Sequence, residues 1–317
     1  MAPISPGRRI AIVFATLAAF LWATYYVLVL WLAPSTSPSA VLVWPLVIGG
    51  GIFALYAFVA GHGAAFWKLW VDPAAWLRIL FGVGMQASTL AATYTAGPID
   101  TSLLSLIGDV VVAPLVLMIL YAEGRDRLRS REFIAGLSLS VVGGGLTIAG
   151  GHALSPVTGW AVLVIPVLPL SVALYFVMTA RAARTVPLAA LNAQAFLGAG
   201  LVLLLASPVL PGGAIGLIAL TPSAIGLLVV LGATTFFLAP LLYFLAIERA
   251  GLILTALLMA SIPVFTLALA VGVLGIVPSL LGALGVPVAL IGAMFAIQGN
   301  HPPWTPEYDE GGGASRG

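Results

Sequence analysis

The sequence contains no cysteine, which excludes disulfide bonds, thiol redox chemistry and thiolate metal sites. Charged residues are also scarce. They make up 7% of the 317 residues, whereas an ordinary soluble domain has about 25%. Twelve basic and ten acidic side chains cannot cover the surface of a folded chain of this length in water. These shortages exclude a soluble enzyme, a nucleic-acid-binding protein and a disordered chain, and they indicate that lipid solvates most of the surface.

The sequence lacks the residues that several kinds of chemistry require. No GxxxxGK[ST] phosphate loop is present, so the chain is not expected to hydrolyse ATP. The three histidines, His62, His152 and His301, map to expected loops or the C-terminal tail, which argues against a membrane metalloprotease or a serine–histidine hydrolase. No lysine or arginine is expected inside the membrane, so no cationic clamp for phosphate is expected either. The sequence predicts neither an enzyme nor a bound cofactor or metal.

Long apolar runs are abundant, since 62% of the residues are hydrophobic. A helix needs about 20 such residues to cross a hydrocarbon core of about 30 Å. The runs are too continuous for barrel strands, and the first is too long for a signal peptide. The sequence therefore predicts an all-α integral membrane protein with ten transmembrane helices. The expected spans are 10–32, 40–60, 74–95, 98–121, 133–151, 157–180, 188–206, 222–246, 250–274 and 278–298.

Positive charge predicts the orientation, because lysine and arginine are enriched in cytoplasmic loops. With ten spans, all twelve positive side chains, Arg78 included, fall on the side that carries both termini. The opposite links carry none: they are 33–39, 96–97, 152–156, 207–221 and 275–277. Both termini are therefore expected in the cytoplasm, with 1–9 as a short N-terminal segment and the polar residues 299–317 as a disordered tail.

The chain also contains a weak internal repeat. The segment AGPIDTSLL at 96–104 resembles AGLILTALL at 250–258, and ATYYV at 23–27 resembles ALYFV at 173–177. These matches divide the chain into two repeats of five helices, 10–151 and 157–298. Because five is odd, the second repeat is expected to be inverted relative to the first. Inverted repeats around a central cavity are typical of secondary transporters.

Four short motifs resemble the drug/metabolite transporter superfamily, in its ten-helix EamA-type branch. They are LWAT at 21–24, YTAG at 94–97, AEGR at 122–125 and SIPVF at 261–265. The resemblance covers roughly 10–298, and the overall pattern is most similar to bacterial exporters of amino acids, including aromatic ones. It implies a secondary transporter in the bacterial inner membrane that exports neutral or aromatic amino acids by alternating access. The chain departs from its own repeat at Asp109, where the second copy has Pro263.

Two aspartates lie within the expected fourth span. Asp109 falls near the midplane, and Ser105 lies four residues before it on the same helix face. An ionisable group at that depth costs on the order of 2.5–3.5 kcal/mol on insertion scales. Asp109 either contacts a substrate ammonium or carries a proton, or it is a protonated residue bonded to a neighbouring helix. Asp100, at the outer end of the span, is expected to cap the helix.

Polar and aromatic residues at helical spacing predict the lining of a central cavity. Aromatic rings offer apolar area and a face for a cation. The alternative for each residue is core packing or, for serine and threonine, a hydrogen bond within the membrane that is worth about 0.6 kcal/mol on average. The expected lining residues are Trp22, Tyr25, Tyr26, Trp44, Gln86, Thr89, Thr93, Ser105, Asp109, Ser171, Tyr175 and Met259.

The expected partners are a small-molecule substrate and the lipid bilayer, and no nucleic acid. The sequence does not indicate the oligomeric state or a coupling ion. Export of lipophilic cations, drugs or other small metabolites is an alternative function, because an acidic, aromatic cavity would suit them as well. A membrane enzyme or scaffold without a transport cycle is a third interpretation, for which the sequence offers neither a large soluble domain nor an intramembrane histidine.

Overall fold

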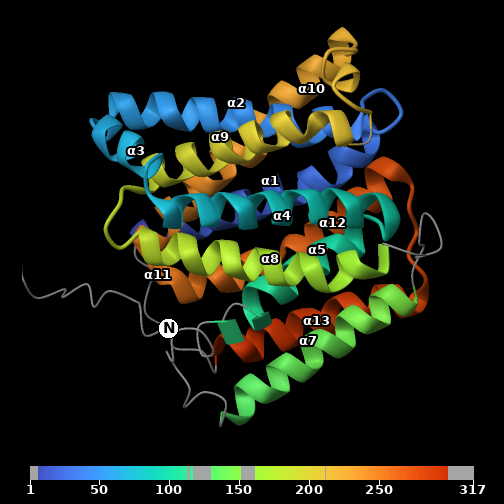
Figure 1. The fold of residues 1–317 in the computed structure, drawn as a ribbon. Helices are drawn as coiled ribbons and strands as arrows, with labels where there is room; N and C mark the ends of the chain where they lie inside the picture. Colours follow the sequence, from blue (N-terminus) through green and yellow to red (C-terminus); the bar gives the residue numbers. More distant parts are fainter. Residues whose placement is uncertain (1–5, 113–114, 117–129, 151–160, 211, 299–317) are drawn as a thin grey trace, which may run out of the picture.

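The computed structural model describes residues 6–112, 115–116, 130–150, 161–210 and 212–298. Every regular element in these ranges is a helix (Figure 1). Within these ranges, four segments are long and apolar enough to cross a membrane: Arg9–Leu32, Pro38–Val59, Leu188–Val209 and Pro222–Arg249. The prediction of an all-α chain with membrane-spanning helices is therefore confirmed.

Seven helices lie within a few residues of expected spans. Proline at the first turn and a side-chain cap explain where several of them begin. The hydroxyl of Ser37 accepts a hydrogen bond from the Ala40 amide at the start of α2, and the carboxylate of Asp72 does the same for the Ala74 amide at the start of α4. The seven are α1 (Pro6–Leu32), α2 (Pro38–Val59), α4 (Pro73–Thr95), α7 (Arg131–Ala149), α8 (Ala161–Ala182), α9 (Leu188–Ala206) and α13 (Leu280–Gln298).

A short helix, α3 (Gly63–Leu69), was not expected. It occupies the link between α2 and α4 and buries Phe66 and Leu69, which pack in the same apolar core as α9. Two further turns, η3 (Ser207–Val209) and η4 (Ile215–Leu217), lie in the link after α9.

The expected fourth span begins as α5 (Pro98–Ile107) and continues as the π-helical turn η1 (Gly108–Val112). Most of its remainder lies outside the described residues. A second π-helical turn, η5 (Thr234–Leu238), joins α10 (Pro222–Ala233) to α11 (Ala239–Met259).

The expected break at 247–249 is absent, because α11 continues without interruption to Met259. The chain instead breaks at Ala260 and Ser261, before α12 (Ile262–Leu274). The equivalent corner in the first half does break, since Gly97 adopts a φ of 99° and Pro98 has no amide hydrogen to continue α4. The second half has Leu252 in place of that proline, so the helix can continue.

The helices pack in layers (Figure 1). In the view of Figure 1, α2 and α9 form one side, α1, α4, α8 and α12 the middle, and α7 with α13 the other side. The α7–α13 pair has its backbones in direct contact. A Cβ atom added at Gly136 or Gly143 would collide with the α13 backbone, and one added at Gly292 would collide with the α7 backbone.

The link between α1 and α2 lies against the link between α9 and α10. The hydroxyl of Ser37 donates to the Gly216 carbonyl at 2.8 Å, and that of Ser39 donates to the Gly213 carbonyl at 3.2 Å. Nearby, the indole Nε1 of Trp44 donates to the Leu217 carbonyl at 2.9 Å. These bonds fix the two links side by side at one end of the bundle.

Candidate functional site

Asp109 lies in η1, where the fourth span changes from an α-helix to a π-helix. The preceding Gly108 is buried against α8, and a Cβ atom there would collide with the Pro169 carbonyl and the Val172 side chain. Asp109 itself is exposed. Single π-helical turns occur frequently at functional sites, because they redirect one side chain out of the regular helical pattern.

Two tyrosines of neighbouring helices interact electrostatically with this carboxylate. Tyr26 of α1 interacts with Ser105 and, electrostatically, with Asp109, while the Ser105 hydroxyl donates to the Thr101 carbonyl of its own helix at 3.0 Å. Tyr243 of α11 also interacts electrostatically with Asp109. The ring of Trp22 lies on Tyr243, with 5.5 Å between the centroids and 59° between the planes. We call Trp22, Tyr26, Ser105, Asp109 and Tyr243 the Asp109 cluster.

Four members of the Asp109 cluster were predicted from the sequence, and Tyr243 was missed. The helix face that contains Tyr243 carries no other polar residue in α11. The sequence pattern therefore did not indicate that Tyr243 faces a polar site. The contact depends on the packing of α11 against α1, which buries Leu242 and Ala246 among the small residues of α1. Only the tertiary structure brings Tyr243 to Asp109.

The chemistry of the Asp109 cluster suits an organic cation with an apolar part. A carboxylate can pair with an ammonium group, and tryptophan and tyrosine faces attract cations and stack on rings. Trp22, Ser105 and Tyr243 are half-buried rather than closed off. Within the described residues, no group of three histidine, aspartate or glutamate side chains could hold a metal ion.

Two further predicted residues lie beside the Asp109 cluster. Tyr25 is buried and packs edge-on against Tyr26, with ring centroids 5.6 Å apart, and against Phe236 at 5.8 Å. Met259 is buried in the apolar contact of α1 with α11, to which Trp22 also belongs. Both residues support the walls of the site rather than contacting Asp109.

The remaining predicted residues are not brought to Asp109. Trp44 is held by its bond to Leu217 at one end of the bundle. In α4, the hydroxyl of Thr89 donates to the Met85 carbonyl and that of Thr93 donates to the Thr89 carbonyl, each at 2.7 Å, so both are satisfied within their own helix. Three others are buried in the packing of the helices: Gln86 in α4 and Ser171 and Tyr175 in α8.

Arg78 corrects one expectation from the sequence. It was counted among the loop charges, and no arginine was expected inside the membrane-spanning bundle. In the structure Arg78 lies in the second turn of α4 and is 2% exposed. Its Nη2 donates to the Gln194 Oε1 of α9 at 2.6 Å. Hydropathy missed this position because a single arginine near a helix start is normally solvated at the membrane surface.

The surroundings of Arg78 are rich in hydrogen-bond donors. Its own Nε, the hydroxyl of Tyr175, and Nε2 of Gln194 are all buried without a hydrogen-bond partner. Arg78 interacts electrostatically with Tyr175 and with Asp72, which caps α4. We call Arg78, Tyr175 and Gln194 the Arg78 cluster.

Comparison with known proteins supports a membrane transporter fold. The model of the EamA-like transporter family matches residues 159–298, a little less than half of the chain. A solved structure described as "Crystal structure of protein" is 20% identical with a TM-score of 0.65, covering 90% of this chain and 96% of its own. No curated protein matches this sequence. Together with the apolar helices, the family match indicates an all-α, multi-pass membrane protein.

Proposed function

We propose that the chain is a secondary transporter that exports neutral and aromatic amino acids from the cytoplasm across a bacterial inner membrane by alternating access. The observation that carries the proposal is the Asp109 cluster, in which tyrosines of α1 and α11 interact electrostatically with one carboxylate of η1 and Trp22 packs against one of these tyrosines. The match to the EamA-like transporter family supports transport of a small molecule.

The proposed architecture has ten transmembrane helices in two inverted repeats, 10–151 and 157–298. Residues 1–9 and 299–317 lie in the cytoplasm. The grouping of the links supports this topology. The links 33–39 and 212–217 are bonded to each other, and the corner at 96–98 lies with the end of α7, the link 275–279 and the start of α13. All of these links are at one end of the bundle, and α3 is at the other (Figure 1).

In this proposal, the ammonium of the amino acid pairs with Asp109. Its side chain packs on the faces of Trp22 and Tyr243, while the Tyr26 hydroxyl hydrogen-bonds to the substrate. Each contact is of a type found at amphipathic binding sites. The same cluster would also accept a lipophilic cation, which lacks the carboxylate of an amino acid. Export of such cations is therefore the second candidate function.

Transport by the purified protein in proteoliposomes tests the proposal. Labelled neutral and aromatic amino acids and lipophilic cations would be compared, with and without a proton gradient. We expect counterflow of aromatic and large neutral amino acids, saturable by unlabelled substrate. Transport of lipophilic cations without amino-acid competition would replace the proposal with the second function, and no transport of either class would overturn both.

The topology gives a prediction of its own. The chain has no cysteine, so single cysteines report position without background. Ser35 is exposed in the first of the two bonded links, and Ser223 is exposed in the first turn of α10, just after the second. Thr185 is exposed between α8 and α9. We expect Ser35→Cys and Ser223→Cys to react with an impermeant thiol reagent in intact cells, whereas Thr185→Cys reacts only after the cells are opened. Labelling of Thr185→Cys in intact cells would contradict the proposed orientation.

The aromatic residues of the Asp109 cluster give a second prediction. Trp22→Ala and Tyr26→Ala should reduce transport of aromatic amino acids at least fivefold more than transport of alanine. The reason is that stacking and apolar contact scale with the surface of the substrate. Michaelis constants in proteoliposomes provide the measurement, and Trp67→Ala, at an exposed ring of α3, is the matched control. Equal losses for all substrates would show that Trp22 and Tyr26 serve only to pack the bundle.

A further inference from the structure

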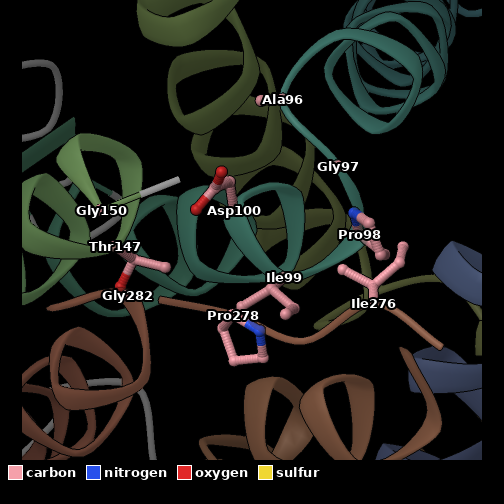
Figure 2. A pocket seen from close by; sticks show the side chains of 10 residues that line it. All are labelled: Ala96, Gly97, Pro98, Ile99, Asp100, Thr147, Gly150, Ile276, Pro278 and Gly282. Atoms are coloured by element: carbon pink, nitrogen blue, oxygen red, sulfur yellow. The ribbon is translucent and has the colours of Figure 1, made fainter. Parts of the chain in front are cut away.

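A buried carboxylate, Asp100, lies away from the Asp109 cluster, at the end of the bundle where α4 meets α5. A pocket of about 30 Å³ opens there between the corner at 96–98, the end of α7 and the link from α12 to α13. Figure 2 shows Asp100 pointing into it, with Thr147 on the opposite wall and Ile99, Ile276 and Pro278 closing one side. The volume suits one or two waters or a small cation and is far below that of an amino-acid site.

Asp100 does not act as the helix cap that the sequence predicted. The N-cap position of α5 is Gly97, and no side chain bonds to the first-turn amides there. Asp100 is only 6% exposed, and in the described part of the chain its carboxylate has no hydrogen-bond donor. A buried carboxylate without a donor or a counter-ion is costly when it is ionised. A cation beside Asp100 would offset that cost.

The helix ends around the pocket favour a cation near an ionised carboxylate. The C-terminal ends of α4 and α7, at Ala96 and Gly150, both line the pocket, and each carries the negative end of a helix dipole. Asp100 itself is the third residue of α5, where the positive end of the dipole stabilises the charged form of an acid. The hydroxyl of Thr147 donates to the Gly143 carbonyl at 3.0 Å, which leaves its oxygen lone pairs for another partner.

We propose that this pocket binds one alkali cation of the size of Na⁺, with Asp100 as its charged ligand. One carboxylate balances one positive charge, whereas calcium sites usually draw on several oxygen ligands, carboxylates among them. Carbonyls at helix C-terminal ends are a recurring source of ligands for Na⁺ in membrane proteins. A cation here would tie the α4–α5 corner to the α7–α13 pair. The inference does not depend on the identity of the transported substrate, because it concerns binding alone.

Thermal unfolding of the full-length protein in detergent tests the inference. Melting would be followed in increasing NaCl, with N-methylglucamine chloride holding the ionic strength constant. We expect 100 mM Na⁺ to raise the Tm by roughly 3–6 °C, as for a ligand at 10 to 100 times its dissociation constant. Asp100→Asn should lose this increase, and Glu248→Gln, which removes an exposed carboxylate, should keep it.

Two results would overturn the inference: a Tm of the unchanged protein that does not depend on Na⁺, or an equal increase in Asp100→Asn. If Asp100→Asn does not fold, Thr147→Val decides the question, because it keeps the shape of the side chain and removes one oxygen. We expect the half-saturating Na⁺ concentration to rise several-fold in Thr147→Val. An unchanged concentration in that variant would equally overturn the inference.

Discussion

Asp109→Asn should lower the initial rate of amino-acid transport by about 10- to 100-fold while leaving the folded protein intact. Asparagine keeps the shape of the side chain but cannot carry the negative charge that would pair with an ammonium group. Hydrogen bonds to charged groups contribute about 1.5–3 kcal/mol, which corresponds to roughly that range of affinity. Counterflow in proteoliposomes gives the rate, and size-exclusion elution together with the Tm shows whether the fold is kept.

Asp100→Asn is the matched control, because it neutralises the other aspartate of the same expected span. Its effect on substrate affinity should be small, since Asp100 lies in a separate pocket. A second comparison is Ser105→Ala, which removes a hydroxyl that donates to its own helix and should lower the transport rate only a few-fold. Wild-type transport by Asp109→Asn would show that the residue is a neutral, hydrogen-bonded part of the packing and would remove it from the site.

The second large effect concerns stability and the Arg78 cluster. Gln194→Leu should lower the free energy of unfolding by about 2–4 kcal/mol, because it removes the hydrogen-bond acceptor that the buried Arg78 guanidinium has in the described part of the chain. Breaking a buried charged contact by removing one partner is strongly destabilising. Unfolding in denaturant, or the Tm in detergent, gives the measurement.

The double variant Arg78→Met/Gln194→Leu separates this explanation from simple loss of packing. Replacing a buried polar pair by apolar residues of similar volume is often neutral or stabilising, so the double variant should recover most of the loss. Gln86→Leu provides the control, since Gln86 is a buried amide of α4 that bonds to no charged group among the described residues. If Gln194→Leu alone were as stable as the wild type, Arg78 would have another partner in the membrane.

Much of the fold could be predicted because lipid imposes a simple requirement on the sequence. Long apolar runs ended by proline or glycine locate α1, α2 and α9 within a few residues. The errors occur where apolarity does not decide the local geometry. Both the unbroken course of α11 and the π-helical turn at Asp109 depend on backbone hydrogen bonding within apolar helices, which hydropathy does not report.

The candidate site was predictable only in part, for a related reason. Trp22, Tyr26 and Asp109 are unusual residues for the middle of a membrane span, and this alone singled them out. The hydroxyl stripe of α4 gave the same signal, yet Thr89 and Thr93 bond to their own helix. Periodicity identifies a polar face but does not show whether the face bonds inward to its backbone or outward to a neighbour.

The backbone contact between α7 and α13 has a consequence for how the protein responds to its membrane. Each helix has 19 residues and is therefore about 28 Å long, close to the hydrocarbon thickness of about 30 Å. Since no side chains separate the two backbones at Gly136, Gly143 and Gly292, neither helix can tilt without the other. A change in bilayer thickness would therefore tilt the two helices together as one rigid body rather than each helix independently.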